Sequence, residues 1–183
     1  RRLSESGSLT GLVNRRAFLS YLAEHLAQAG GPGALLYVDL DNFKRVNDVR
    51  GHIAGDDVLV AVARMLVAHS RENDVAARLG GDEFALFMTG ITAETAMRRA
   101  ATLSQTARDA LADESGDPGH PLGISIGVAA TDPANPESAT DLLERADAAM
   151  YRAKKAGKGE VAFAHAPGDG DAEARGYADP TSA

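Results

Sequence analysis

The chain has 183 residues, 44% of them hydrophobic, which is enough to bury the core of one domain with short tails. A formal net charge of −7 argues against broad electrostatic binding to nucleic acid or to an anionic membrane, while local basic positions can still bind one small anion. The absence of cysteine excludes disulfides and thiolate metal sites and suits a reducing compartment. No apolar run approaches the roughly 20 residues that a membrane-spanning helix needs.

The sequence begins at Arg1 without a signal peptide, and we expect it to be a piece of a longer protein. The expected location is the cytoplasm, either for a free protein or for the inner part of a membrane-anchored one. Residues 1–8 are polar and are predicted to end a linker. Residues 9–165 are predicted to form one domain, and residues 166–183, rich in Gly, Asp and Ala, a disordered tail or linker.

Apolar residues at helical spacing, short apolar runs and glycine or proline breaks divide the sequence into elements. The first half predicts a helix at 14–29, a strand at 34–40, a short helix at 43–49 and a longer helix that begins at Asp56. The second half predicts hairpin arms at 75–79 and 83–88, a helix at 92–113, a strand at 122–130, an amphipathic helix at 138–156 and a strand at 161–163.

After the first helix, the order β-α-α-β-β-α-β-α-β predicts an α/β (α+β) domain. Its central sheet is expected to be mostly antiparallel and flanked by helices. The hairpin would lie beside the first strand, as in ferredoxin-like and polymerase-palm arrangements.

Two acidic turns are the most informative feature. Asp39 comes where the strand at 34–40 ends, and Asp82 follows Gly80-Gly81 between the hairpin arms. A pair of glycines fits a tight two-residue turn, because glycine adopts positive φ freely. If the two strands are neighbours, the carboxylates converge and can hold a magnesium ion that also binds water and substrate phosphates. Two solvated turn acids are the alternative.

Phosphate binding is suggested by Phe43 and Lys44, which begin a helix directly after the first acidic turn. The N–H groups of a helix N-terminus attract phosphate, although Asn42 acting as a plain N-cap explains the same residues without a ligand. Lys154 and Lys158 end the last amphipathic helix. They either stabilise the helix dipole or clamp a triphosphate.

Guanine recognition is suggested by Asn47 and Asp56, which flank a loop that contains His52. A carboxylate accepts both N1–H and the exocyclic amine of guanine, whereas adenine lacks that pair of donors. Helix-start chemistry is the alternative for Asp56, and a structural role is favoured over a catalytic one for His52. Arg71 precedes the hairpin and suits base stacking or phosphate binding, with a solvated helix-end charge as the alternative.

Together these runs resemble the diguanylate cyclase (GGDEF) family over residues 9–163. The matching segments, in order and at the family's intervals, are Leu9-Thr10-Gly11-Leu12-Val13-Asn14-Arg15-Arg16, Asp39-Leu40-Asp41-Asn42-Phe43-Lys44, Asn47-Asp48, Gly51-His52, Gly55-Asp56, Arg78-Leu79-Gly80-Gly81-Asp82-Glu83-Phe84, and Ala149-Met150-Tyr151-Arg152-Ala153-Lys154 with Gly157.

The resemblance implies condensation of two GTP into cyclic di-GMP with release of two pyrophosphates, in a homodimer, with product inhibition. The implied metal is Mg²⁺ (or Mn²⁺), and its ligands are Asp39, the Leu40 carbonyl, Asp82 and Glu83. Asp82 and Glu83 are the implied catalytic residues, Asp82 being the candidate acceptor of the 3′-hydroxyl proton. The implied GTP-binding residues are Phe43, Lys44, Asn47, His52, Asp56, Gly80, Gly81, Lys154 and Lys158. Arg71 and Asp74 match the family's product-inhibition site.

The sequence departs from the family pattern at two places. Gly7 stands where Asp is usual at the domain entrance, and Lys158-Gly159 replaces Arg-Asn. Lysine keeps the charge but loses the bidentate fork of arginine. The alternative function is a module that senses GTP or cyclic di-GMP without turnover and regulates an attached domain. A polymerase-type palm acting on nucleic acid fits poorly with the negative charge.

Overall fold

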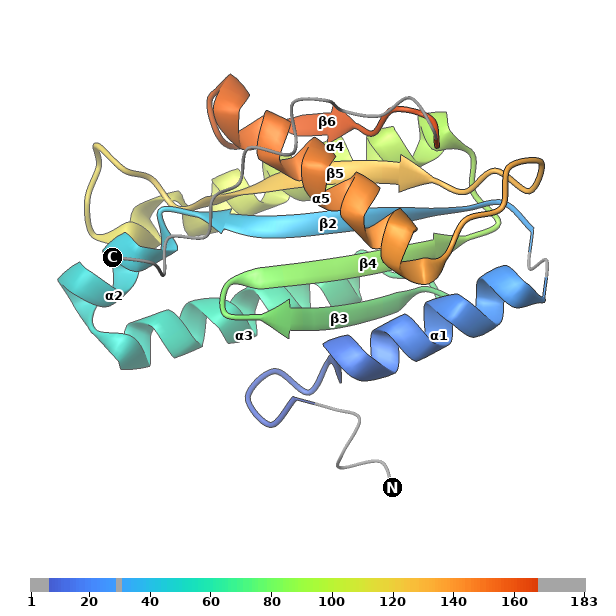
Figure 1. Cartoon of the computed structure of the whole chain (residues 1–183). Coiled ribbons are helices and arrows are strands. Elements are labelled where there is room, and N and C mark those ends of the chain that lie inside the picture. The colour runs from blue at the N-terminus through green and yellow to red at the C-terminus, as the bar shows by residue number, and fades with distance from the viewer. Residues whose placement is uncertain (1–6, 29–30, 168–183) are drawn as a thin grey trace, which may run out of the picture.

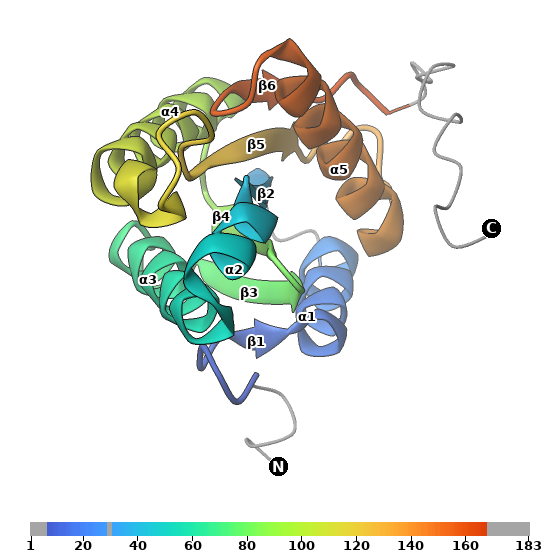
Figure 2. The same cartoon turned by 90° about the vertical axis from the view of Figure 1, so that its left-hand side faces the viewer.

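A six-stranded sheet, built within residues 7–28 and 31–167 that the computed structural model describes, forms the central layer in the order β1-β3-β4-β2-β5-β6. The strands are β1 (Val13–Asn14), β2 (Gly33–Asp41), β3 (Val75–Gly80), β4 (Glu83–Thr89), β5 (Gly123–Ala130) and β6 (Val161–Phe163). The helices are α1 (Arg15–Ala27), α2 (Phe43–Arg50), α3 (His52–Ala68), α4 (Ala93–Leu111) and α5 (Ala139–Ala156), with the short 3-10 helix η2 (Ala112–Ser115) after α4. Helices α3 and α4 cover one face of the sheet, and α1 and α5 cover the other (Figure 1, Figure 2).

Strand β2 is central because its sequence is apolar on both faces until its last residues. Side chains of a strand alternate between the two faces. Leu36 and Val38 pack in the core under α3 and α4, whereas Leu35 and Tyr37 pack in the core under α1 and α5. The predicted buried strand is therefore confirmed. Asp39, two residues after Tyr37, belongs to the face that α1 and α5 cover.

Helix α5 is amphipathic, as predicted, and lies close against β5. A Cβ atom at Gly127 would be 2.0 Å from the carbonyl oxygen of Ala146 and 2.3 Å from the backbone nitrogen of Met150. Glycine allows this approach because it has no side chain. The contact sets the height of α5 above the sheet and hence the position of the lysines at its C-terminal end.

The sheet is mixed rather than mostly antiparallel. Strand β2 pairs antiparallel with β4 and β5, and β3 pairs antiparallel with β4, so the hairpin lies beside β2 as predicted. The outer pairs β1–β3 and β5–β6 are parallel. Strand β1 was not predicted, because two residues are too few to show an alternating pattern.

Two helix starts differ from the prediction. Helix α1 begins at Arg15, and Asn14 is its N-cap, accepting a 2.9 Å hydrogen bond from the N–H of Ala17. Helix α3 begins at His52 rather than at Asp56. Gly51, with φ 88°, separates α2 from α3 without an intervening loop. The glycine permits this sharp change of direction, which the sequence pattern did not reveal.

Among the described residues, no helix combines the length and the apolar character that are needed to cross a bilayer. Most of the predicted linker end at 1–8 and of the predicted tail at 166–183 lies outside the described residues.

Candidate active site

The end of β2 and the turn between β3 and β4 meet at one edge of the sheet. Asp39 lies opposite Glu83 in the antiparallel register of β2 and β4. The backbone N–H of Leu40 donates a 3.2 Å hydrogen bond to the carbonyl oxygen of Asp82. The two acidic turns are therefore neighbours in the fold, although they are far apart in the sequence.

The hairpin turn consists of Gly81 and Asp82, not of the predicted Gly80 and Gly81. Gly80 is the last residue of β3 and pairs with Glu83, after a bulge between Arg78 and Gly80. Gly80 and Gly81 have φ values of 151° and 47°, which other residues rarely adopt. Arg78 fixes the turn by donating from Nε and Nη2 to the Gly81 carbonyl at 3.1 and 2.8 Å. Arg78 had no predicted role beyond its place in the motif.

Asp39 is a largely buried carboxylate. Its side chain is 14% exposed, and its Oδ1 atom is buried without a hydrogen-bond partner among the described residues. Burial raises the pKa of Asp39 to about 7 against the lowering effect of Lys154, and the nearby carboxylates of Asp82 and Glu83 add to the rise. A cation bound at Oδ1 would give this oxygen a partner and would reduce the repulsion between the three carboxylates.

Lys154, in the last turn of α5, reaches this acidic edge. Its Nζ atom lies 3.1 Å from Asp39 Oδ2 and 3.6 Å from Asp41 Oδ1, and donates a 3.1 Å hydrogen bond to the Leu40 carbonyl. Stabilisation of the helix dipole therefore does not fully account for Lys154, because its ammonium group contacts residues at the end of β2.

Lys158 follows α5 and contacts the turn after β2. Its Nζ donates a 2.8 Å hydrogen bond to Asn42 Oδ1, and Asn42 Nδ2 donates to the carbonyl of Pro121 at 2.7 Å. The alternative of Asn42 as a plain N-cap is wrong. The residue has a left-handed backbone, with φ 63°, and its side chain makes no capping hydrogen bond to α2.

Asp41 is a buried carboxylate that the sequence did not single out. Its side chain is 3% exposed and accepts hydrogen bonds of 2.7 Å from Ser125 Oγ and from the N–H of Gly159. It therefore joins the end of β2 to the loop after α5. Gly159, one of the two departures from the family pattern, makes this contact through its backbone. The alternation of β2, which puts Asp41 on the same face as Asp39, was the available signal.

The oxygen donors at this edge fit a hard divalent cation. Asp39 offers a carboxylate oxygen without a hydrogen-bond partner among the described residues, Leu40 offers a carbonyl, and Asp82 lies in the adjoining turn. Magnesium is usually held by one or two protein carboxylates, with water and substrate phosphates completing its shell. Within the described part of the chain, no group of three or more His, Cys, Asp or Glu side chains is arranged to hold a metal ion by itself. These residues therefore suit a metal ion that takes only some of its ligands from the protein.

Asn47 and Asp56 lie on two helices in direct contact. A Cβ atom at Gly55 would be 2.0 Å from Asn47 Oδ1 and 3.4 Å from Phe43 Cζ, so the glycine lets α2 and α3 touch. Asn47 thus packs beside the residue that precedes Asp56. Because α3 has no acid in its first turn, helix-start chemistry does not explain Asp56.

The other residues of this region differ in exposure. Lys44 is exposed on α2, and His52 is exposed at the first position of α3. Phe43 is partly buried and packs against the core under α3 and α4. Phe43 therefore supports the fold whether or not it also contacts a ligand.

Arg71 and Asp74 lie at the other end of β3 from the Gly81-Asp82 turn, about 20 Å along a six-residue strand. They line a surface hollow of about 370 Å³ with Gly11, Leu12, Val13, Val67, Ser70, Glu72 and Ala76. Arg71 is exposed. The Asp74 side chain is 1% exposed and accepts hydrogen bonds from the N–H of Arg71 at 2.9 Å and from Arg99 at 3.0 Å. Asp74 thus shapes the hollow, and Arg71 and Glu72 supply exposed charges of opposite sign.

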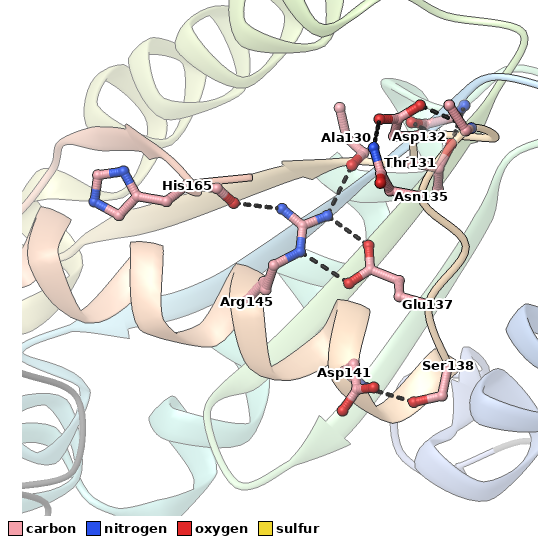
Figure 3. Close-up of polar contacts among 11 residues, drawn as sticks. Ala130, Thr131, Asp132, Asn135, Glu137, Ser138, Asp141, Arg145 and His165 are labelled. Atoms are coloured by element: carbon pink, nitrogen blue, oxygen red, sulfur yellow. Dashed lines mark hydrogen bonds and ion pairs between the residues drawn. The ribbon is translucent and has the colours of Figure 1, made fainter. Parts of the chain in front are cut away.

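At the N-terminal half of α5, Arg145 joins three segments of the chain (Figure 3). Its guanidinium forms a bidentate ion pair with Glu137 at 2.6 and 2.9 Å. It also donates to the carbonyls of Ala130 and His165, each at 2.8 Å. Bidentate pairs of this kind are geometrically well defined. This clamp holds α5 to the end of β5 and to the chain after β6, so the lysines at its other end extend from an anchored helix.

The predicted site residues fall into three groups in the structure. The acidic edge of the sheet brings together Asp39, Leu40, Gly80, Gly81, Asp82, Glu83, Lys154 and Lys158. The α2–α3 pair carries Phe43, Lys44, Asn47, His52 and Asp56. Arg71 and Asp74 stand apart at the hollow.

The family profile described as "Diguanylate cyclase, GGDEF domain" matches residues 5–160, which is most of the chain. The chain belongs to the GGDEF diguanylate cyclase family. The resemblance inferred from the motifs is therefore confirmed, and the six-stranded sheet with its helices is the fold of this family.

Named GGDEF relatives cover the same region. The chain is 38% identical over 170 residues to "Probable diguanylate cyclase DgcC" of Escherichia coli strain K12, covering 88% of this chain and 44% of the relative. It is 39% identical over 158 residues to "Diguanylate cyclase DgcM" of the same strain, covering 84% of this chain and 37% of the relative. The chain thus spans less than half the length of these curated relatives.

Solved GGDEF structures resemble the fold closely. The coiled coil and GGDEF domain of DgcB from Caulobacter crescentus, in complex with c-di-GMP, superposes with a TM-score of 0.81 at 30% identity, covering 90% of this chain and 87% of that one. The diguanylate cyclase SiaD from Pseudomonas aeruginosa, in complex with its activator SiaC, gives a TM-score of 0.77 at 34% identity. The match covers 88% of this chain and 64% of the SiaD chain.

Proposed function

We propose that this GGDEF domain condenses two molecules of GTP into cyclic di-GMP and releases two pyrophosphates. The observation that carries the proposal is the meeting of Asp39, the Gly81-Asp82 turn and Lys154 at one edge of the sheet. Relatives named diguanylate cyclase and the complex of DgcB with c-di-GMP support it.

Metal binding is assigned to Asp39 and Asp82, with the Leu40 carbonyl and Glu83 assisting. The unpaired Oδ1 of Asp39 and its raised pKa favour a cation at this position. Bound Mg²⁺ or Mn²⁺ supplies positive charge to the phosphates during the reaction.

The chemistry is an in-line displacement at phosphorus. The 3′-hydroxyl oxygen of one GTP bonds to the α-phosphorus of the other, the bond from that phosphorus to pyrophosphate breaks, and Asp82 is the candidate acceptor of the hydroxyl proton. A second displacement with the roles exchanged closes the ring. Lys154 and Lys158 neutralise the triphosphate, and the N–H groups at the start of α2, near Phe43 and Lys44, attract its negative charge.

Base selection is assigned to the α2–α3 pair. Asp56 accepts the two adjacent donors of guanine, and Asn47, packed against Gly55, satisfies a further edge of the base. The exposure of Asp56 and His52 leaves this surface open to a nucleotide.

Catalysis requires two copies of the domain. Each copy offers one GTP site, and the attacking hydroxyl must come from a second bound GTP, so two domains face each other as a homodimer. Product binding is assigned to the hollow beside Arg71, whose guanidinium can stack on a base and bind phosphate.

The test is to incubate the purified protein with GTP and Mg²⁺ and to identify the products by mass, with ATP as the control substrate. Cyclic di-GMP and pyrophosphate in a 1:2 ratio are the expected products. Binding of GTP or cyclic di-GMP without turnover would point instead to a sensing module that regulates an attached domain.

A further inference from the structure

Lys154 contacts the same two groups that the proposed function assigns to the metal ion. Its Nζ lies 3.1 Å from Asp39 Oδ2 and 3.1 Å from the Leu40 carbonyl oxygen. A third acceptor, Asp41 Oδ1, lies at 3.6 Å. The first two distances are those of hydrogen bonds, whereas the third is an electrostatic contact. Lys154 is thus held by three oxygens of the end of β2.

The position of Lys154 is imposed by the fold rather than by a chance surface contact. Its side chain is 24% exposed, and those of Asp39 and Asp41 are 14% and 3% exposed. The preceding residue, Ala153, is buried, and α5 lies directly against Gly127 of β5. The root of the lysine is thus held over the end of β2, where its flexible stem reaches the carboxylates.

The same lysine is assigned to the triphosphate in the proposed function. One ammonium cannot fully engage both the β2 carboxylate and a phosphate, and two cations repel each other at the short separations that shared oxygen ligands impose. A divalent ion would take Oδ1 of the same carboxylate whose Oδ2 contacts Lys154, and would share the Leu40 carbonyl with it. Each of the two cations therefore weakens the binding of the other.

We propose that Lys154 is a built-in counter-ion of the metal site, which leaves Asp39 and Leu40 when a divalent ion binds and then pairs with the phosphates of the nucleotide. This inference rests on the proposed function, because it takes the metal ligands and the phosphate role from it. Its consequence is that the metal alone binds weakly, since it must displace a lysine whose remaining contact, with Asp41, is a long one at 3.6 Å. The nucleotide provides a new partner, so metal and GTP bind cooperatively.

The first experiment measures Mn²⁺ binding to the 183-residue protein without nucleotide, by the electron paramagnetic resonance signal of free Mn²⁺. Lys154→Met should tighten Mn²⁺ binding about 10-fold, within the usual range of coupling between sites. Lys155→Met is the matched control, because it removes the same charge from the next residue, which is exposed and lies over the Tyr151 ring. The control should change the affinity less than 2-fold.

The second experiment needs no variant. Wild-type protein is acetylated with a lysine-reactive ester with and without Mg²⁺, and each lysine is quantified by mass spectrometry. Lys154 should react slowly in the absence of Mg²⁺ and several-fold faster in its presence, whereas Lys155 should react at an unchanged rate. A Lys154 rate that is indifferent to Mg²⁺ would overturn the proposal.

Asp39→Asn separates this inference from the proposed function. If Mn²⁺ binding depends on Asp39 but Lys154→Met leaves the affinity unchanged or weaker, only the role of Lys154 is wrong. If Mn²⁺ binding is indifferent to Asp39, the metal assignment itself is wrong, and this inference fails with it.

Discussion

The hydroxyl of Tyr37 donates a 2.7 Å hydrogen bond to Glu83 Oε2, across the neighbouring strands β2 and β4. Tyr37 is 3% exposed and lies two residues before Asp39 on the same face. In the register of the two strands, Glu83 lies opposite Asp39. The hydrogen bond therefore draws one Glu83 oxygen toward Tyr37 and limits how the two facing acids arrange themselves.

This hydrogen bond predicts a pH dependence of stability. Burial, followed by the hydrogen bond to Glu83, raises the pKa of Tyr37 well above its usual value. Because the folded protein retains the proton longer than the unfolded chain, the stabilisation is complete below about pH 10 and is lost as the pH rises above it. Tyr37→Phe should cost about 1 kcal/mol at pH 8.

The difference in unfolding free energy between wild type and Tyr37→Phe should shrink above about pH 10. Urea unfolding of both proteins between pH 8 and pH 11 provides the measurement. Parallel curves over the whole range would show that Tyr37 ionises alike in the folded and unfolded chains.

Asp82→Asn should abolish turnover while the fold persists. The substitution nearly conserves volume and keeps the backbone carbonyl that accepts from Leu40, but removes one carboxylate from the proposed metal site. Loss of several kcal/mol of charge stabilisation corresponds to a fall in rate of at least about 100-fold. Production of cyclic di-GMP is followed by chromatography, with circular dichroism as the check of folding. Activity at the wild-type level would exclude Asp82 from the metal site.

Asp56→Asn should weaken GTP binding and reduce the preference for GTP over ATP. The substitution replaces one acceptor oxygen by an amide NH2 group, which faces the N–H donors of guanine. A guanine donor left without an acceptor costs about 1–3 kcal/mol. Calorimetry with non-hydrolysable analogues of GTP and ATP measures both affinities. Asp57→Asn is the matched control, because Asp57 is the neighbouring exposed acid and has no assigned contact. Equal effects of the two substitutions would argue for a general charge effect instead of base recognition.

Arg71→Ala should relieve inhibition by added cyclic di-GMP and leave the initial rate at low product nearly unchanged. Arg71 is exposed at the hollow, far along β3 from the acidic edge. Initial rates are measured over a titration of product, with Arg64→Ala, another exposed arginine, as the control. Inhibition curves that coincide for wild type and Arg71→Ala would leave Arg71 as a solvated helix-end charge.

Asp74→Ala should act mainly on stability. Its carboxylate is 1% exposed, forms an ion pair with Arg99, and accepts from the backbone N–H groups of Arg71 and Thr89. Breaking a buried pair on one side costs about 3 kcal/mol, whereas Arg71→Ala should stay within about 0.5 kcal/mol of wild type. Urea unfolding compares the two variants. Equal stabilities would mean that the Asp74 contacts contribute little and that its role lies at the ligand.

The parts of the fold that follow from local chemistry were predictable from the sequence. The uninterrupted apolar run of β2 and the helical spacing in α5 indicated buried elements. The acidic residues at the strand ends were expected to converge, and the two turns are neighbours in the fold. The start of α3 at His52 was missed, because Asp56 and Asp57 resembled the acids of a first helical turn. Gly51 alone separates α2 from α3, so the sequence shows no loop between them. Strand β1 exists through its pairing with β3, a contact that only the folded chain reveals.

The burial of two acids was not predicted: Asp41 was not singled out from the sequence, and Asp74 was expected only as a residue of the product site. The roles of Asp41 and Asp74 depend on partners far away in the sequence, Gly159 and Arg99 respectively. A buried carboxylate cannot be told from a solvated one until the partners that offset its desolvation are known. From the sequence, these acids could be assigned to a strand end or a turn, but the burial of their carboxylates could not be predicted.

The hollow beside Arg71 has one wall from the segment by which the chain enters the domain, namely Gly11, Leu12 and Val13. That segment is folded back on itself, since the N–H of Gly7 donates to the Leu12 carbonyl at 2.8 Å. A load on the chain ahead of this loop would deform the wall of the hollow. A nucleotide bound there would, by the same free energy, stiffen the loop against that load. If the product binds in this hollow as proposed, its affinity and the conformation of residues 7–13 are therefore linked.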